Sequence, residues 1–165
     1  MARSHRPTVA EEIGQRIPFE SRGQEAMVSV LRTADALRNY LTAKLAGGDV
    51  TLQQYNVLRI LRGAGSDGLP TLTIGERMIE RQPGVTRLVD RLALKGLVVR
   101  RRGTSDRRRV LCHITSAGLD LLGRLDTYID EADEVVKGTL PPARLADLLE
   151  LLDEVRAGLH GDSGV

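Results

Sequence analysis

The chain has 165 residues, of which 41% are hydrophobic and 2% aromatic, and its formal net charge is +2. This length suits one domain with helical extensions, and the scarcity of aromatic residues means that Leu, Val, Ile and Ala must build the core. No apolar run is long enough to cross a bilayer, and the N-terminus lacks the hydrophobic region of a signal peptide. Because Cys112 is the only cysteine, an intrachain disulfide is excluded and a reducing cytoplasm is the expected location.

Residues 1–20 mix charged residues with Pro7 and Pro18. They predict a partly mobile arm, or a short helix and an extended arm lying on a partner subunit. For the first ten residues the composition favours disorder.

A long helix is predicted over residues 21–46, because apolar residues recur there at helical spacing and Gly47-Gly48 follows. The apolar positions are Met27, Leu31, Ala34, Leu41 and Leu45. So long an apolar stripe needs a surface to cover it. Thr51 and Gln54 then have the spacing of a capping box, which predicts a helix to about Arg62 and a loop over residues 63–70.

Residues 71–96 predict a short helix, a turn and a second helix. Thr73 and Glu76 again have capping-box spacing, so the short helix is expected from about Ile74 to about Arg81. Pro83 suits the first position of the second helix, where its missing N–H is not needed, and Gly96 is expected to end that helix. One buried stripe is formed by Val85, Leu88, Val89 and Leu92.

Two β-branched runs follow, at residues 97–99 and 110–114, joined by the arginine-rich loop RRRGTSDRRR. Val110, Cys112 and Ile114 alternate on one face, as expected of a strand with one side on the core. A helix-turn-helix followed by a two-stranded wing is a shape that binds duplex DNA.

The distribution of charge supports a DNA partner better than the net charge does. Only Asp90 and Asp106 are acidic between residues 81 and 109, whereas acidic residues far outnumber basic ones after Thr115. The basic residues of this segment are Arg81, Arg87, Arg91, Lys95, Arg100, Arg101, Arg102, Arg107, Arg108 and Arg109. One localised basic patch is typical of a protein that binds the phosphate backbone.

Thr115-Ser116 is expected to begin another long helix, which Gly138 and Pro141-Pro142 end, and a last leucine-rich helix follows to about residue 160. Together with the helix over 21–46, these helices carry more leucine than a small winged domain can bury. The excess predicts an interface.

The run GVTRLVDRLALKGLVVRR, the wing sequence Asp106-Arg107-Arg108 and the following Thr115-x-x-Gly118 resemble the DNA-binding domain of the MarR family of winged-helix transcription regulators. The resemblance extends from about Arg22 to about Leu159. It implies a mainly α fold with a small β wing, in which residues 50–115 form the winged helix-turn-helix domain. Residues 21–46 and 116–160 would be the dimerisation helices of a homodimer, which presents two recognition helices to half-sites about 34 Å apart.

In this arrangement we expect the helix from about Pro83 to Lys95 to enter the major groove. Thr86 and Arg87, near its N-terminal end, are candidates for contact with base edges. Gly84 would let the backbone approach a phosphate. Arg91 is expected either to contact phosphate or to hold the wing through Asp106.

The wing supplies the other candidate contacts. The resemblance assigns Arg108 to the adjacent minor groove and gives Asp106 the role of orienting the loop. Phosphate contacts, which add affinity without sequence information, are expected from Arg102, Arg107 and Arg109. Asp90 and Lys95 are interpreted as solvated side chains.

The resemblance also implies a small aromatic or phenolic anion as effector, held between the dimerisation helices and the winged domain. Candidate lining residues are Arg38, Tyr40 and Tyr55, although a surface salt bridge explains Arg38 equally well. The favoured function is a ligand-released repressor acting as a homodimer on a palindromic operator. The alternatives are a constitutive or architectural DNA binder without effector, or a winged-helix module for protein–protein contact.

No catalytic arrangement is expected. The sequence has neither a phosphate-binding glycine loop nor a nucleophile with a base close in sequence. His5, His113 and His160 match no metal spacing, and Cys112 is interpreted as a small buried hydrophobe. We therefore expect no enzyme activity, cofactor or metal.

Overall fold

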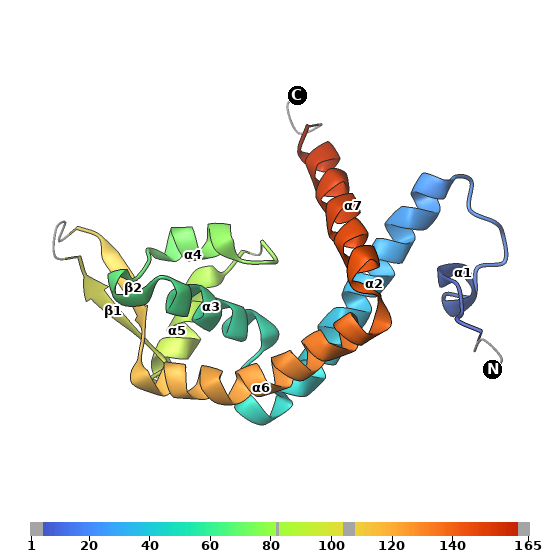
Figure 1. The fold of residues 1–165 in the computed structure, drawn as a ribbon. Helices are drawn as coiled ribbons and strands as arrows, with labels where there is room; N and C mark the ends of the chain where they lie inside the picture. The colour runs from blue at the N-terminus through green and yellow to red at the C-terminus, as the bar shows by residue number, and fades with distance from the viewer. Residues whose placement is uncertain (1–4, 82, 104–107, 162–165) are drawn as a thin grey trace.

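The computed structural model describes residues 5–81, 83–103 and 108–161. In chain order its elements are α1 (Val9–Glu12), α2 (Arg22–Leu45), η1 (Ala46–Gly48), α3 (Leu52–Gly63), η2 (Gly65–Asp67), α4 (Thr71–Arg77), α5 (Val85–Leu94), β1 (Val98–Arg102), β2 (Val110–Ile114), α6 (Ser116–Thr139) and α7 (Pro142–Gly161). Helices α3, α4 and α5 and the β1–β2 hairpin form one lobe, from which α2, α6 and α7 extend (Figure 1). The predicted fold class, mainly α with a small β wing, is confirmed.

The hydrophobic core lies inside this winged lobe. Three helices and the hairpin contribute side chains with no exposed surface, and the first half of α6 closes the core from one side. The fully buried side chains include Val57, Leu58 and Leu61 of α3, Ile74 of α4, Val89 and Leu92 of α5, Cys112 of β2 and Leu122 of α6. The stripe predicted for α5 is confirmed, with Val85 and Leu88 partly buried at its start.

Three helices, α2, α3 and α6, each begin just after a residue whose side chain caps them. The Ser21 hydroxyl accepts the Gln24 amide at the start of α2, and the Thr115 hydroxyl accepts the Gly118 amide at the start of α6. At α3 the capping box is complete, because Thr51 accepts from the Gln54 amide and the Gln54 side chain accepts from the Thr51 amide. Each contact satisfies a backbone donor that has no partner within the helix.

The second predicted capping box is wrong. Helix α4 begins at Thr71 and ends at Arg77, so Thr73 lies inside it and Pro70 is the N-cap. The reason is non-local: the Leu69 amide and carbonyl exchange hydrogen bonds with Cys112 of β2, at 3.0 and 2.8 Å. This pairing holds the chain extended up to Pro70 and lets the helix begin immediately after it.

The boundaries around α5 and β1 also differ from the prediction. Pro83 is not the first residue of α5, because Gly84 is its N-cap, with φ of 106°, and the helix starts at Val85. Gly96 does follow the helix in a left-handed conformation, as predicted. Strand β1 extends to Arg102, since Arg100–Arg102 pair with residues 110–112 of β2 instead of belonging to the loop.

At the N-terminal end, residues 9–12 form the short helix α1, which contacts α2 through an ion pair of 3.3 Å between Glu12 and Arg32. Residues 1–4 lie outside the described part of the chain. Of the helices described, none has the length and apolar character to span a bilayer.

Candidate DNA-binding surface

Helices α4 and α5 pack closely at the turn that joins them. A Cβ atom on Gly75 of α4 would lie 3.3 Å from a methyl carbon of Val85, so the absent side chain allows the two helices to approach. Gly84 supplies the left-handed turn before α5, and its carbonyl accepts from the amide of Arg87 at 2.9 Å. With the apolar stripe turned into the core, Thr86 and Arg87 lie exposed in the first turn of α5. Pro83 is also exposed, immediately ahead of the turn.

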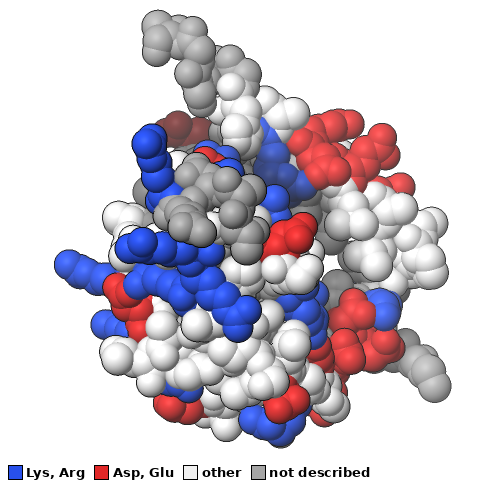
Figure 2. Space-filling model, turned by 90° about the vertical axis from the view of Figure 1, so that its left-hand side faces the viewer, with Lys and Arg blue, Asp and Glu red and all other residues white. Residues whose placement is uncertain are grey.

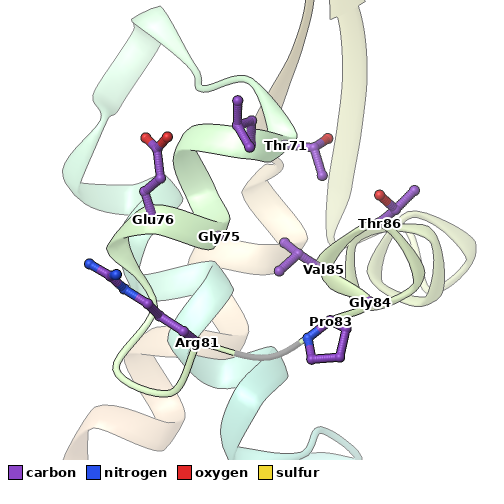
Figure 3. Close-up of a pocket in the computed structure, with 9 residues that line it drawn as sticks. Thr71, Gly75, Glu76, Arg81, Pro83, Gly84, Val85 and Thr86 are labelled. Atoms are coloured by element: carbon purple, nitrogen blue, oxygen red, sulfur yellow. The ribbon is translucent and has the colours of Figure 1, made fainter. Parts of the chain in front are cut away.

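A hollow of about 650 Å³ lies between α4 and the turn and first residues of α5. Figure 3 shows Glu76 and Arg81 toward one end of it and Thr71 and Thr86 toward the other. The start of α5 therefore lies at the edge of an open groove. The positive end of a helix dipole at such a position favours an anionic group.

The wing places further arginines at the end of the hairpin. Arg102 is exposed at the end of β1, and Arg108 and Arg109 are exposed at the point where the chain returns to β2. The Gly103 amide donates to the Arg109 carbonyl at 2.9 Å and closes the base of the loop. Asp106 and Arg107 lie outside the described residues.

An ion pair fixes the wing against the recognition helix. Arg100 of β1 donates to the Asp90 carboxylate of α5, and this hydrogen bond is the main cause that raises the pKa of Arg100. Lys95 bonds to the carbonyl and, at 2.9 Å, to the carboxylate of Asp49, a residue with φ of 51°. The interpretation of Asp90 and Lys95 as merely solvated is therefore wrong. Asp90 links α5 to β1, and Lys95 links α5 to the segment before α3.

The sequence predicts that Arg91 either contacts phosphate or holds the wing through Asp106. It is exposed and lines a second hollow, of about 560 Å³, together with Asp49, Thr51 and Lys95, at the start of α3. The described link from α5 to the wing is made by Asp90, one residue earlier. The alternative contact, with Asp106, falls on a residue outside the described part of the chain.

Charge is segregated on this end of the molecule. In Figure 2, Lys and Arg side chains gather around the wing, and Asp and Glu lie mainly to one side. Such a local positive surface attracts a polyanion even though the whole chain is nearly neutral. In the described part of the chain no three His, Cys, Asp or Glu side chains are arranged to hold a metal ion.

Comparison with known proteins decides the family. The MarR family matches residues 50–110. The crystal structure of a MarR transcription factor from Planctomyces limnophilus is 36% identical, with a TM-score of 0.62, and the alignment covers 82% of this chain and 98% of that one. The chain belongs to the MarR family. It is a DNA-binding transcriptional regulator with a winged helix-turn-helix domain.

Two further relatives are an operon repressor and a regulator whose structure holds a ligand. The homoprotocatechuate degradative operon repressor of Escherichia coli is 26% identical over 127 residues, covering 77% of this chain and 84% of that protein. The structure of NadR in complex with 4-hydroxyphenylacetate is 25% identical, with a TM-score of 0.67, and covers 84% of this chain and 97% of that one.

In this MarR-family chain an apolar hollow of about 280 Å³ lies between α2, α3 and the segment that leads into α5. Arg38 stands at its edge and donates to the Glu80 carboxylate at 2.7 Å. That hydrogen bond is the main cause that lowers the pKa of Glu80 and raises the pKa of Arg38. The hollow is lined by Ala34, Leu37, Arg38, Leu41, Leu52, Gln53, Asn56, Met78, Ile79 and Glu80.

The other two predicted effector residues lie elsewhere. Tyr40 lines a groove between α2 and α6, and the Tyr55 hydroxyl donates to Asp126 of α6 at 2.9 Å. The three residues therefore do not share one cavity. Glu80 was missed by sequence reasoning because its partner lies 42 positions away, and no spacing rule links two such positions.

Proposed function

We propose that this regulator is a homodimeric repressor that binds a palindromic operator and is released when a small aromatic or phenolic anion occupies the hollow beside Arg38. The observation that carries the proposal is the geometry of α5 and the wing, which expose arginines on two elements held together by the Asp90–Arg100 ion pair. Two grooves of a duplex can accept such a pair of elements at once.

The uncovered apolar surface of α2, α6 and α7 supports a dimer. No described residue of α7 is buried, and Leu149, Leu151 and Leu159 are each more than half exposed. On α2, Met27 and Leu31 are equally exposed. A surface of this kind on a water-soluble regulator is stabilised by a second copy, whose two-fold symmetry would match that of a palindrome.

The roles of individual residues at the operator follow from their positions. Thr86 and Arg87 would read base edges from the first turn of α5, where Gly84 lets the backbone approach a phosphate. Pro83 would hold that turn at the DNA surface.

On the wing, Arg108 would enter the minor groove with Asp106 orienting the loop. Arg102, Arg107 and Arg109 would contact phosphates, and Arg91 would do so from the side of α5.

The hollow beside Arg38 suits an effector with an apolar ring and one anionic group. Its wall is mostly aliphatic, and Arg38 is a cation at its edge, with Gln53 and Asn56 as polar neighbours. Binding there would act on the segment Met78–Glu80, which leads directly into the turn before α5. Ile79 is bonded through its amide to the Asn56 side chain at 3.0 Å, so this segment already depends on α3.

The test begins with an operator selected from random duplexes by the wild-type protein. We expect Arg87→Ala to weaken operator binding by about 1–3 kcal/mol and to relax specificity at one base pair. Arg108→Ala should lower both the affinity and the slope of log affinity against log salt. Arg124→Ala, an exposed arginine on α6 outside the patch, is the matched control and should change neither. An unchanged affinity and salt slope for Arg108→Ala would remove the wing from the proposal.

Release is tested separately by thermal shift with 4-hydroxyphenylacetate and related aromatic acids. A ligand that binds the native state raises the melting temperature. Arg38→Gln should abolish the shift, and a ligand that acts should also weaken operator binding by the wild-type protein. A shift that survives Arg38→Gln would place the effector elsewhere.

A further inference from the structure

A polar stripe on α3 faces helix α6. Tyr55, Arg59 and Arg62 follow one another at intervals of four and three residues and therefore lie on one side of α3. Opposite them stands Asp126 of α6. The Tyr55 hydroxyl donates to Asp126 Oδ1 at 2.9 Å, Arg59 approaches the same oxygen at 3.6 Å, and Arg62 donates to Oδ2.

The contacts within this group, the Asp126 cluster (Tyr55, Arg59, Arg62 and Asp126), reinforce one another. Arg59 also donates to the Tyr55 hydroxyl at 2.9 Å, so that oxygen both accepts and donates. Tyr55 is 6% exposed and the Asp126 side chain 26%. Burial raises the pKa of Asp126, but the hydrogen bonds from Arg62 and Tyr55 and the charges of Arg62 and Arg59 outweigh it, so the pKa lies below its ordinary value. The cluster therefore stabilises the ionised form of the Asp126 side chain.

The Asp126 cluster lies between the part of α6 that packs on the winged lobe and the part that packs along α2. Leu122 and Leu125, just before Asp126, are buried with the core of the winged lobe. Ala132, further along, lines a groove against α2, and Lys44 of α2 bonds to Glu131 at 2.6 Å. Because α6 continues unbroken to Thr139, the angle between α3 and α6 carries over to the helices that extend from the lobe (Figure 1).

Leucine contacts define that angle less sharply than directional bonds do, because apolar burial is non-directional. Two hydrogen bonds to one carboxylate, from Tyr55 and Arg62 on turns of α3 seven residues apart, define both rotation and register. A polar group of this kind can contribute geometric definition where its net contribution to stability is small.

We propose that Asp126 is a positioning residue for operator recognition: it locks α3 to α6 and thereby sets the separation of the two recognition helices in the dimer. The inference rests on the proposed function, because separation has meaning only for a dimer on two half-sites. It assigns the choice of half-site spacing to a residue that touches no DNA.

The experiment compares operators that differ only in spacing. The wild-type protein selects its palindrome, and affinities are then measured for that duplex, for versions with extra base pairs (~3.4 Å each) between the half-sites, and for one half-site alone. The variants are Asp126→Asn and Tyr55→Phe. Asp120→Asn, an exposed acid on the same helix, gives the same change of charge and serves as the control.

We expect the wild-type protein and the control to lose about tenfold or more in affinity with the first inserted base pair. Asp126→Asn and Tyr55→Phe should lose less than about threefold, with affinity for the single half-site unchanged. A merely structural role would lower all affinities together and leave the spacing profile as it is. If both variants kept the wild-type spacing profile, the proposal would be wrong.

A measurement without DNA separates this proposal from the proposed function. Cys112 is fully buried, so Leu94→Cys, at an exposed position of α5, introduces one reactive site for a spin label. The distance between the two labels of the dimer should have a narrow distribution in the otherwise wild-type protein and a broad one with Asp126→Asn. Equal widths would overturn the role of Asp126 even if the operator is bound. A wild-type protein that enriches no palindrome would overturn the proposed function, whatever the distances show.

Discussion

Arg38 of α2 donates a hydrogen bond of 2.7 Å to Glu80, which lies just before the turn into α5. This contact joins a proposed dimerisation helix to the segment that supports the recognition helix. Both side chains are partly exposed, so solvent screens the ion pair and its contribution to stability is small. In the proposed function the ion pair connects the helix beside the effector hollow to the segment that leads into the recognition helix.

The first prediction concerns pH. The pKa of Glu80 is lowered in the folded protein by the hydrogen bond from Arg38, so its stabilising contribution is present above the unfolded pKa, near 4.5, and is lost as pH falls through the folded value. Urea unfolding at one protein concentration should show Glu80→Gln to be less stable than the wild type near neutral pH, with the difference shrinking below about pH 4.5. Glu76→Gln, at an exposed position of α4, should show little difference at either pH. A gap between Glu80→Gln and wild type that widened in acid would contradict the assignment.

The second prediction distinguishes two neighbouring arginines of β1. Arg100 bonds to Asp90, whereas Arg101 is exposed on the opposite face of the strand. We expect Arg101 to contact phosphate, so Arg101→Ala should reduce the slope of log affinity against log salt by about 1. Arg100→Ala should weaken binding several-fold while leaving the slope nearly unchanged, because it acts through the position of the wing. Asp90→Asn should reproduce the loss seen with Arg100→Ala, and a fall in slope with Arg100→Ala would show that Arg100 contacts phosphate instead.

The extent to which sequence predicts this fold depends on the range of the interactions. Local signals were sufficient for α3 and α6, whose Thr51 and Thr115 caps and apolar stripes lie within a few residues. They failed at α4, where the start is set by pairing of Leu69 with Cys112, 43 positions further on. The candidate site divides in the same way. The exposure of Arg87 and Arg108 agrees with the helix pattern and the wing motif, whereas the contacts of Arg38, Tyr55 and Asp90 depend on partners that no local rule identifies.

The third prediction compares Thr51 and Thr73, which have the same capping-box spacing in the sequence but different places in the structure. Thr51 accepts the Gln54 amide at 3.2 Å, so Thr51→Ala should destabilise the protein by about 1 kcal/mol. Thr73 has the same spacing to Glu76 but lies inside α4, so Thr73→Ala should change stability by no more than a few tenths of a kcal/mol, because Ala is the better helix former. Chemical denaturation of the wild type and both variants at equal protein concentration measures the two changes in stability. An equal loss for Thr73→Ala would mean that α4 begins at Ile74 after all.

The fourth prediction concerns two glycines of α6. A Cβ atom on Gly118 would lie 2.5 Å from the Leu97 carbonyl oxygen and 2.7 Å from a side-chain carbon of Ile114, so the first turn of α6 can rest on the hairpin only without a side chain. Gly118→Ala must move backbone at the start of β1 and should cost about 1–3 kcal/mol. No atom lies within 4 Å of a Cβ built on Gly123. Gly123→Ala should therefore stabilise the protein by roughly 0.5–1 kcal/mol, because alanine loses less backbone entropy than glycine on folding. Melting temperatures measured together should therefore move in opposite directions. Leu97 and Ile114 lie at the base of the wing, so Gly118→Ala should also weaken operator binding. The binding is measured at temperatures where the variant is fully folded. Unaltered binding there would show that the wing tolerates displacement of its base.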